Sequence, residues 1–346
     1  METVWFICVA LMVAMYVLLD GFDLGAGAIH PFAARNDRER RMIIRAIGPV
    51  WDGNEVWLIA AGGTLFFAFP LLYASGFSGF YLPLIIVLWL LMIRGLSIEL
   101  RTHLESPLWA SFWDAAFFVG SALLAVFYGA ALGNVVRGVP LNEDGYFFQP
   151  LWTDFSPFSE NPGILDWYTV LIGLLALTTL VMHGANFIAV KTENELNARS
   201  RRISRFFSLA TLALTVLATP ATFWVSPWIL QSFNERPYGY VLPLVAIAGL
   251  VGMIYFNFMG RDRATFLSSS AYIVGMLTST VFGVYPNVLP AVDPANSLTI
   301  QNAASSDYSQ AVGLVWWSIG MVLAAIYFIL IYRLFRGKVR LEDEGY

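Results

Sequence analysis

The chain has 346 residues, of which 58% are hydrophobic and only 13% are charged. Soluble domains are about 25% charged, so this composition excludes an ordinary soluble enzyme and is typical of a membrane protein. The net charge of −4 leaves no basic surface for nucleic acid, and the single cysteine, Cys8, excludes a disulfide framework or a cysteine-based metal site.

Nine apolar segments are long enough to cross the ~30 Å hydrocarbon core of a bilayer, which takes about 20 helical residues. In chain order they lie at about 3–29, 54–73, 77–100, 112–136, 164–190, 203–232, 238–259, 265–289 and 309–334. The first begins at METVWF, which has no basic region of the signal-peptide kind, so we expect it to be retained. The second and third are separated by little more than YASG and are predicted to form a tight antiparallel pair. We therefore predict an all-α polytopic membrane protein with one membrane domain, residues 1–346.

A faint internal repeat divides the predicted helices into two halves. Residues 1–136 form the first four-helix half and residues 164–289 the second, and each opens with a long helix followed by a charged loop, RNDRERR or TENELNARSRR. HGANF, at 183–187, takes the place that DGFDLG has in the first half. We expect two four-helix bundles and a ninth, peripheral helix at 309–334.

The positive charges are distributed unevenly between the loops. All but two of the 20 lysines and arginines, Arg137 and Arg236, fall in alternate loops or in the C-terminal tail that ends after Arg340. Lysine and arginine concentrate in cytoplasmic loops. The N-terminus is therefore predicted to lie outside and the C-terminus in the cytoplasm.

Five acidic residues lie in or beside the predicted spans, all in the half expected to face the cytoplasm. They are Asp20 and Asp23 near the end of the first span, Asp52 and Glu55 in GPVWDGNEVW, and Asp114 in FWDAAFFVG. A charge at the bilayer centre costs about 2.5–3.5 kcal/mol on insertion scales, so such residues need a partner or a function. Because burial and neighbouring charges shift the pKa of a carboxyl group, clustered acids can exchange protons near neutral pH.

Asp20 and Asp23, three residues apart, share one helix face and admit two interpretations. They either belong to a proton route or pair structurally, with arginines such as Arg94 or with backbone amides. For Asp52 a proton route is favoured, since Pro49 and Gly53 interrupt the helix and make room for water or for a partner's polar group.

The other two acids have simpler interpretations. Asp114 follows SPLWASFW and is interpreted as a helix N-cap. Glu55 is interpreted as a first-turn acid that the helix dipole favours.

Candidate metal ligands and close helix contacts are few. Of three histidines, His30 and His183 lie deep enough to be considered as ligands and His103 does not, but a lone membrane histidine is more often a hydrogen-bonded packing residue. Trp57 lies a turn into the second span, where anchoring in the aromatic belt is the commoner explanation.

The glycines that allow close helix contact, within this chain or against another, are Gly21, Gly25, Gly27, Gly62 and Gly63. With no nucleotide, zinc or hydrolase signature, the chain is not expected to supply a redox centre alone.

LLDGFDLGAG, RNDRERRMIIRAIGPVWDGNEVWLIAAGGTLFFAFP and SGFYLP resemble subunit II of the cytochrome bd-type quinol oxidases, and GPVWDGNEVWLI is the most specific part. The similarity is dense over 16–101 and looser beyond about 165. The resemblance implies a terminal oxidase of the bacterial or archaeal cytoplasmic membrane, which oxidises quinol, reduces oxygen to water and generates proton-motive force without pumping.

The resemblance also implies the partners. Subunit I would form a heterodimer with this chain and hold haem b and haem d, and this chain would ligate no haem or metal. A small single-span accessory subunit, membrane lipid and a structural quinone in an apolar groove are further expectations, with no nucleic-acid partner.

For two residues the resemblance implies a role. The aspartate of WDGN, here Asp52, would help to form a cytoplasmic proton route at the subunit boundary, and the tryptophan of NEVW, here Trp57, would lie close to an oxygen path.

The rival from another class is a proton-coupled secondary transporter, whose repeats and buried acids look similar. A purely structural scaffold is the third interpretation.

Overall fold

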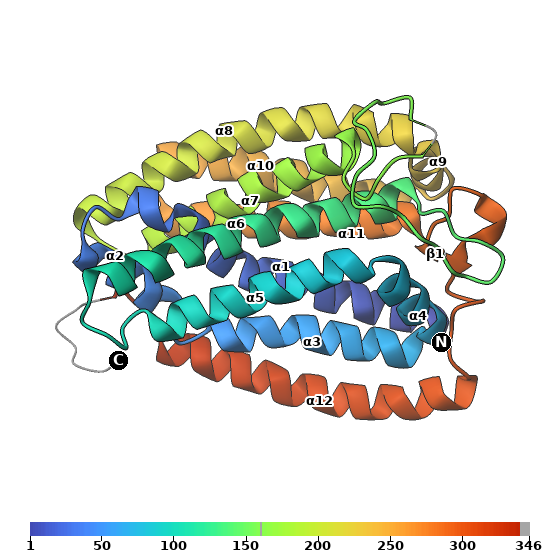
Figure 1. The fold of residues 1–346 in the computed structure, drawn as a ribbon, viewed down its shortest axis with the longest axis horizontal. Coiled ribbons are helices and arrows are strands. Elements are labelled where there is room, and N and C mark those ends of the chain that lie inside the picture. The colour runs from blue at the N-terminus through green and yellow to red at the C-terminus, as the bar shows by residue number, and fades with distance from the viewer. Residues whose placement is uncertain (160, 340–346) are drawn as a thin grey trace.

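The computed structural model describes residues 1–159 and 161–339, so that Arg340, one of the predicted tail charges, lies outside the described residues. The chain forms an elongated bundle whose long helices run roughly along one direction (Figure 1). The N-terminus and the outer connections around α4, α9 and β1 lie at one end, and α2 and the C-terminus lie at the other.

The helices of the first half precede a long connection without regular secondary structure. They are α1 (Glu2–Ala33), α2 (Asp37–Ile47), α3 (Trp51–Ala68), α4 (Pro70–Gly79), α5 (Tyr81–Leu100) and α6 (Pro107–Arg137).

The second half continues with α7 (Trp167–Lys191), α8 (Asn194–Val225), α9 (Pro227–Glu235), a 3-10 turn η1 (Pro237–Tyr240), α10 (Val241–Phe258) and α11 (Asp262–Val284). A small antiparallel hairpin of β1 (Asn287–Leu289) and β2 (Leu298–Thr299), with the turn η2 (Pro294–Asn296) between them, leads to α12 (Asp307–Leu334).

Within the described ranges, 8 helices are long and apolar enough to cross a membrane: α1, α5, α6, α7, α8, the segment Pro237–Phe258, α11 and α12. This confirms an all-α, multi-pass membrane protein. The remaining predicted span corresponds to α3, which lies lengthwise between α5 and α12 (Figure 1). Its mean hydropathy is lowered by Asp52, Asn54 and Glu55 in its first turns.

The predicted tight pair of the second and third segments is wrong. YASG lies inside α4, a separate helix, and α3 packs mainly against α1 whereas α5 packs mainly against α6. Proline is tolerated in the first turn of a helix, where its missing N–H is not needed. Pro70 therefore opens α4 directly after the chain turns at Phe69.

α1 and α7 pack closely against each other where Gly25 faces Gly184. A Cβ added to Gly25 would lie 2.8 Å from the Cα of Gly184 and would overlap the carbonyl oxygen of Leu180. Such small residues let two helix backbones approach closely. The motifs DGFDLG and HGANF, matched in the sequence as repeats, therefore contact each other at the centre of the fold.

The remaining glycines of the sequence prediction divide into two groups. Gly21 and Gly27 also make room inside the chain, for Leu180 and for Ser121 of α6 respectively. Around Gly62 and Gly63 of α3, an added Cβ would meet no described atom within 4 Å. At these two positions α3 is not in close contact with another described helix.

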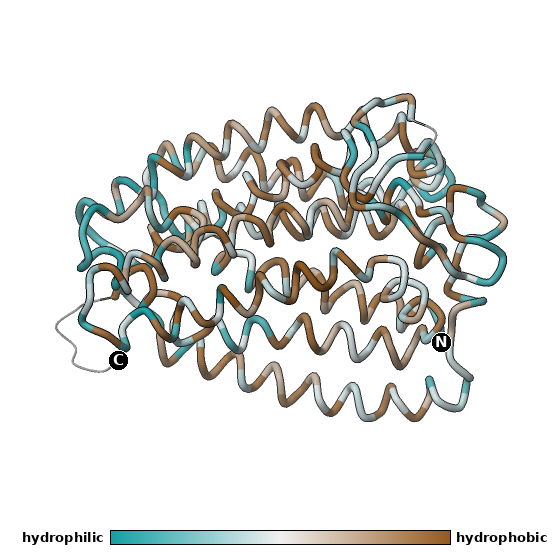
Figure 2. The backbone as a smooth tube through the Cα atoms, viewed as in Figure 1, coloured by the Kyte–Doolittle hydropathy of each residue, from teal (hydrophilic) through white to brown (hydrophobic). Residues whose placement is uncertain are grey.

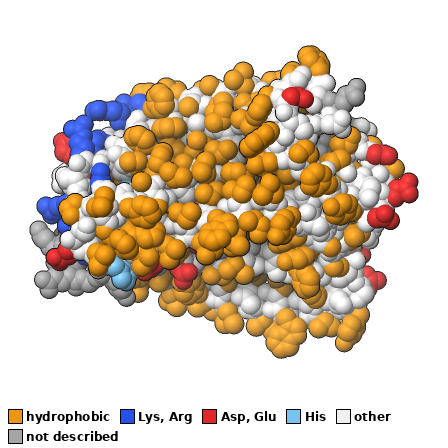
Figure 3. All heavy atoms as spheres, in the orientation of Figure 1, with side chains coloured by type: hydrophobic (Ala, Val, Ile, Leu, Met, Phe, Trp, Pro, Cys, Tyr) orange, Lys and Arg blue, Asp and Glu red, His pale blue; other side chains and the backbone are white. Residues whose placement is uncertain are grey.

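Polar residues collect at the two ends of the bundle, and apolar residues cover its length (Figure 2). On the face shown in Figure 3, lysine and arginine side chains gather at the end that carries α2, and acidic side chains lie at both ends. α12 lies at the edge of the bundle beside α3, and most of its side chains are at least partly exposed (Figure 1).

Candidate functional site

Asp20 and Arg94 form an ion pair in the interior, between α1 and α5. Arg94 Nη1 donates to Asp20 Oδ2 at 2.7 Å, Arg94 Nη2 donates to Asp20 Oδ1, and neither side chain is exposed. A buried ion pair offsets its desolvation only when its geometry is good and its hydrogen bonds are made. The two-point geometry satisfies both oxygens of Asp20, which are committed to one partner, whereas Nε of Arg94 has no partner among the described residues.

Asp23, one turn further along α1, has different surroundings although it is equally buried. Its Oδ2 accepts a hydrogen bond of 2.7 Å from Nδ2 of Asn54 on α3, and its Oδ1 has no partner among the described residues. Buried polar atoms are nearly always paired, with protein or with water. Of the two carboxyl groups, Asp23 is therefore the one with an oxygen available to take up a proton or a water molecule.

Asn54 is the hub of this cluster. Its Nδ2 also donates to the backbone oxygen of Leu19 at 3.3 Å, and its Oδ1 accepts from the hydroxyl of Tyr332 on α12 at 2.9 Å. Tyr16, one turn before Asp20, donates to the hydroxyl of Tyr128 on α6 at 2.8 Å. Five helices thus contribute polar side chains to one buried cluster.

Asp52 lies apart from these groups. It is exposed in the first turn of α3, and no hydrogen bond joins it to Asp20 or Asp23 in the described chain. The chain breaks at the turn around Pro49, as predicted, but the prediction that Gly53 also interrupts the helix is wrong because Gly53 lies inside α3. Glu55 is not the first-turn acid, because Asp52 occupies that turn and Glu55 lies in the next, partly buried.

The interpretation of Asp114 as an N-cap is wrong. The cap of α6 is Ser106, whose hydroxyl accepts from the backbone N–H of Trp109, and Asp114 lies two turns further in. The sequence SPLW already holds a better cap, since serine directly before Pro107 is a typical helix start.

Asp114 instead joins four segments at the end of the bundle that carries α2. Its carboxylate accepts from Nε2 of His30 at 2.6 Å, from Nε of Arg101 at 2.6 Å and from Nη1 of Arg40 at 3.0 Å. Arg101 also donates to Asp37 at 2.8 Å. Burial lowers the pKa of Arg101, but the bonds to Asp114 and Asp37 outweigh it and raise the pKa above its ordinary value. The cluster is a charged clamp between α1, α2 and α6.

Neither buried histidine is placed as a haem ligand. His183 uses both ring nitrogens, at 2.8 Å from Oγ of Ser269 and 3.1 Å from the backbone oxygen of Leu18, and its ring stacks on Phe266. Nε2 of His30 bonds to Asp114, its Nδ1 has no partner among the described residues, and its ring is fully enclosed. In the described part of the chain, neither of these two histidines faces a space that could hold a haem.

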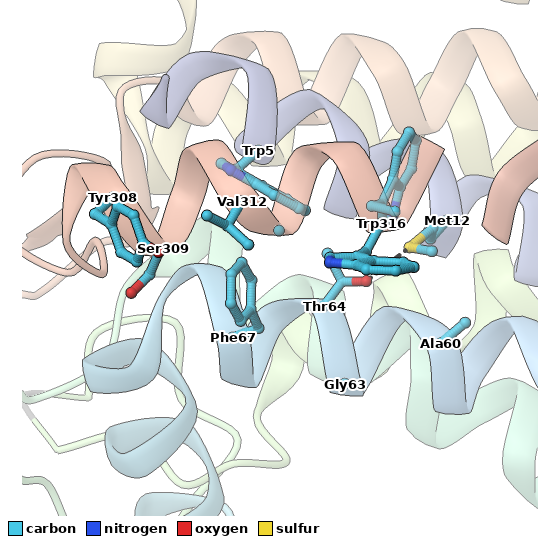
Figure 4. Close-up of a pocket in the computed structure, with 12 residues that line it drawn as sticks. Trp5, Met12, Ala60, Gly63, Thr64, Phe67, Tyr308, Ser309, Val312 and Trp316 are labelled. Atoms are coloured by element: carbon cyan, nitrogen blue, oxygen red, sulfur yellow. Dashed lines mark hydrogen bonds between the residues drawn. The ribbon is translucent and has the colours of Figure 1, made fainter. Parts of the chain in front are cut away.

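An apolar groove of about 610 Å³ opens between α1, α3 and α12. Figure 4 shows Phe67 and Trp316 among the residues that line the space between α3 and α12, and the ring of Phe67 lies 5.4 Å from that of Trp5 on α1. Its remaining lining residues are Met12, Ala60, Gly63, Thr64, Tyr308, Ser309, Val312, Gly313 and Trp317.

Trp57 lies behind this groove. It is 6% exposed, packs in one cluster with Met12 and Tyr16, and its ring lies 5.3 Å from that of Phe328 on α12. Anchoring in the aromatic belt, the commoner explanation for Trp57, is therefore wrong, because a belt residue would lie at the water–lipid boundary.

Four residues of the cluster were not singled out from the sequence: Asn54, Tyr332, Tyr16 and Tyr128. Asn54 stands inside the quoted WDGN motif, and it could have been found from the need of a buried carboxylate such as Asp23 for a hydrogen-bond donor. Tyr332 lies 278 residues further along the chain, and no local pattern relates it to Asn54.

The sequence profile of the cytochrome bd terminal oxidase subunit II family matches residues 1–335. The chain belongs to this family. It is 31% identical to the probable cytochrome oxidase subunit 2 of Haemophilus influenzae, over 97% of this chain and 94% of that one. It is 29% identical to the cytochrome bd-I ubiquinol oxidase subunit 2 of Escherichia coli K12 (98% and 95% covered) and 30% identical to the cytochrome bd ubiquinol oxidase subunit 2 of Bacillus subtilis 168 (90% and 89% covered).

The fold is also that of a known structure. A chain of the bd oxidase from Geobacillus thermodenitrificans superposes with a TM-score of 0.75, at 17% identity, over 96% of this chain and 98% of that one. Membership of the family makes the chain one subunit of a terminal oxidase complex that also contains subunit I. It does not favour a secondary transporter.

Proposed function

We propose that this chain and subunit I together form a quinol oxidase of the bacterial or archaeal cytoplasmic membrane. The names of the E. coli and B. subtilis relatives support ubiquinol or a similar quinol as the electron donor. In the proposal subunit I holds haem b and haem d, and this chain supports it without ligating either. A small accessory subunit and a structural quinone stay predictions.

The proposed complex generates proton-motive force without pumping. Quinol oxidised near the outer face releases protons there, and the formation of water consumes protons taken from the cytoplasm. This requires the acidic cluster to face the cytoplasmic side. In support, the basic end of the bundle is the end at which α1 finishes and α3 begins (Figures 1 and 3), which agrees with an outside N-terminus.

We further propose nine spans in two four-helix halves. α3 would be the ninth span, with α1, α3, α5 and α6 in one half, α7, α8, α10 and α11 in the other, and α12 at the edge. Its alignment with the eight apolar helices supports this arrangement (Figure 1). The low hydropathy of its first turns is consistent with a helix that protein covers and lipid does not. In this proposal subunit I covers α3 on the side that carries Gly62 and Gly63.

The single observation that carries the proton route is the unpartnered, buried Oδ1 of Asp23. Asp52 is exposed where α3 begins and would collect protons from the cytoplasmic side. Asn54, two residues further, contacts Asp23 directly. In this proposal Asp52 and Asp23 carry protons, and Asp20, which is committed to Arg94, holds the two helices together.

For Trp57 we propose a place beside the oxygen path. The groove between α1, α3 and α12 is lined by apolar side chains, which suit oxygen, and Met12 contributes both to the groove and to the cluster around Trp57. Oxygen entering there would pass Trp57 on the way to the partner subunit.

The test of the proton route is Asp52→Asn in the assembled complex, with Asp52→Glu as the matched control that keeps the carboxyl group. We expect Asp52→Asn to lower quinol oxidation by at least about tenfold, because a positioned proton carrier contributes 10²–10⁴-fold to a proton-transfer step. Haem absorption spectra should stay normal. Unchanged turnover would contradict the assignment, and a loss of haem together with turnover would make Asp52 a structural residue.

A second experiment separates the oxidase from a transporter. The chain purified without subunit I should be colourless and inactive, and co-expression with subunit I should give a complex with haem bands and quinol oxidase activity. Proton-coupled transport by the isolated chain would contradict the proposal.

A further inference from the structure

α12 touches the buried cluster at one point. Along the last turns of this helix, Phe328 packs against Trp57, the hydroxyl of Tyr327 lies beside Gly53, and the hydroxyl of Tyr332 reaches the amide of Asn54. The first two contacts are apolar or steric. Among the described residues, only Tyr332 makes a hydrogen bond from α12 to the residues around Asp23.

The amide of Asn54 has a defined orientation in this network. Its Nδ2 faces two acceptors, Oδ2 of Asp23 and the backbone oxygen of Leu19, and its Oδ1 faces a donor, the hydroxyl of Tyr332. An inverted amide would place its oxygen against both acceptors. Hydrogen bonds in a chain strengthen one another at low dielectric. The bond from Tyr332 therefore makes Asn54 a stronger donor to Asp23.

The hydrogen bond from Asn54 makes the two carboxyl oxygens of Asp23 chemically different. Oδ2 is held by Asn54, and Oδ1 has no partner in the described chain. The titratable groups that surround Asp23 are Asp20 on α1, Glu55 on α3, Arg94 on α5 and Tyr332 on α12. Arg94 is occupied by Asp20, and Tyr332 points to Asn54.

We propose that Tyr332 is a positioning residue for proton transfer. Acting through Asn54, it holds the carboxyl group of Asp23 by Oδ2 and so makes Oδ1 the atom that receives and releases the proton. The proton bonds to Oδ1 when Asp23 is neutral and leaves from the same oxygen. The inference rests on the proposed proton route, and it gives the peripheral helix α12 a role in that route.

The test is Tyr332→Phe in the assembled complex, with Tyr327→Phe on the same helix as the matched control. Loss of the hydroxyl weakens the donor that stabilises the carboxylate form of Asp23. The midpoint of the pH profile of quinol oxidation should therefore move to higher pH, by a fraction of the roughly 0.5–1 pH unit expected if the whole hydrogen bond from Asn54 to Asp23 were lost. Tyr327→Phe should leave the midpoint in place. Equal midpoints for both variants and the unaltered complex would overturn the inference.

A double-variant cycle tests whether Tyr332 acts through Asn54. If it does, Asn54→Leu should shift the midpoint at least as far as Tyr332→Phe, and adding Tyr332→Phe to Asn54→Leu should cause no further shift. Additive shifts would show that Tyr332 acts by another path and would overturn the inference.

Infrared difference spectroscopy separates this inference from the proton route itself. The carboxyl C=O band that disappears in Asp23→Asn should shift in frequency in Tyr332→Phe and stay unchanged in Tyr327→Phe, irrespective of turnover. If turnover does not respond to Asp23→Asn, the proposed route fails while the band still reports the positioning. A band that is identical in Tyr332→Phe and the unaltered complex overturns the positioning, even if Tyr332→Phe lowers the yield of complex.

Discussion

Asp20 of α1 and Arg94 of α5 share a two-point ion pair in which neither side chain is exposed. The neighbouring Asp23 has no such partner and is held by one neutral amide. Two carboxyl groups one turn apart thus have different chemical surroundings, and this difference supports the proposal that Asp20 is structural and that Asp23 carries protons.

Asp20→Asn should destabilise the complex, because it leaves the charge of Arg94 buried without a counter-charge. Removal of one partner of a buried ion pair costs about 3–5 kcal/mol. We expect a lower yield of assembled complex and a lower thermal unfolding temperature. In the double variant Asp20→Asn with Arg94→Leu, which removes both charges, much of the stability should return. A single variant as stable as the unaltered complex would contradict the structural role.

Gly184→Ala should weaken the contact between the two halves. The added methyl group would lie against the backbone of Gly25 and Ala26, where neither helix can yield without moving as a whole. Overpacking of this kind costs about 1–3 kcal/mol. Gly320→Ala on α12 is the matched control, since a Cβ there meets nothing within 4 Å and alanine favours a helix. Thermal unfolding of the complex distinguishes the two, and equal stabilities would argue against close packing of α1 on α7.

Asp114→Asn should loosen α2. The substitution removes the acceptor charge for three donors, His30, Arg101 and Arg40, which together fix α2 to α1 and α6. Hydrogen exchange of the α2 amides in the complex should become faster, by tenfold or more if about 1.5–3 kcal/mol is lost. Asp262→Asn, which removes the acceptor of Arg201 at the same end, is the control and should spare α2. Unchanged exchange in α2 would count against the clamp.

Val312→Trp should obstruct the groove between α1, α3 and α12. If oxygen enters there, the KM for oxygen should rise several-fold while turnover at saturating oxygen stays the same, since the variant changes access and not chemistry. Val315→Trp on the same helix does not line the groove and serves as the control. An unaltered KM for oxygen in Val312→Trp would exclude this groove as the entry.

The sequence was sufficient for the parts of the fold that depend on local apolar periodicity. Eight of the nine predicted segments are helices apolar enough to span a membrane, since about 20 apolar residues in a row have few alternatives. It failed where a span is interrupted or polar. α4 was missed because Pro70 starts a new helix inside an apolar run, and α3 was placed without its first turn because Asp52 lowers the hydropathy there.

The site was predicted in its residue types and missed in its pairings. Asp20, Asp23 and Asp52 stood out as charges in an apolar context, and Arg94 was named as a partner. The sequence could not show whether Arg94 pairs with Asp20 or with Asp23. Both aspartates lie on one helix face, and the position of α5 determines which of them Arg94 reaches. For the same reason Tyr332 could not be connected to Asn54, since their contact depends on how α12 lies against α3.

The central claim is that protons reach the reaction centre through Asp23. Proton uptake from the cytoplasmic side, followed together with quinol oxidation in the complex reconstituted into vesicles, tests this most directly for Asp23→Asn against Asp23→Glu. Both rates should fall together by at least about tenfold in Asp23→Asn, with normal haem spectra, and Asp23→Glu should retain a measurable part of them. Undiminished uptake and turnover in Asp23→Asn would contradict the account.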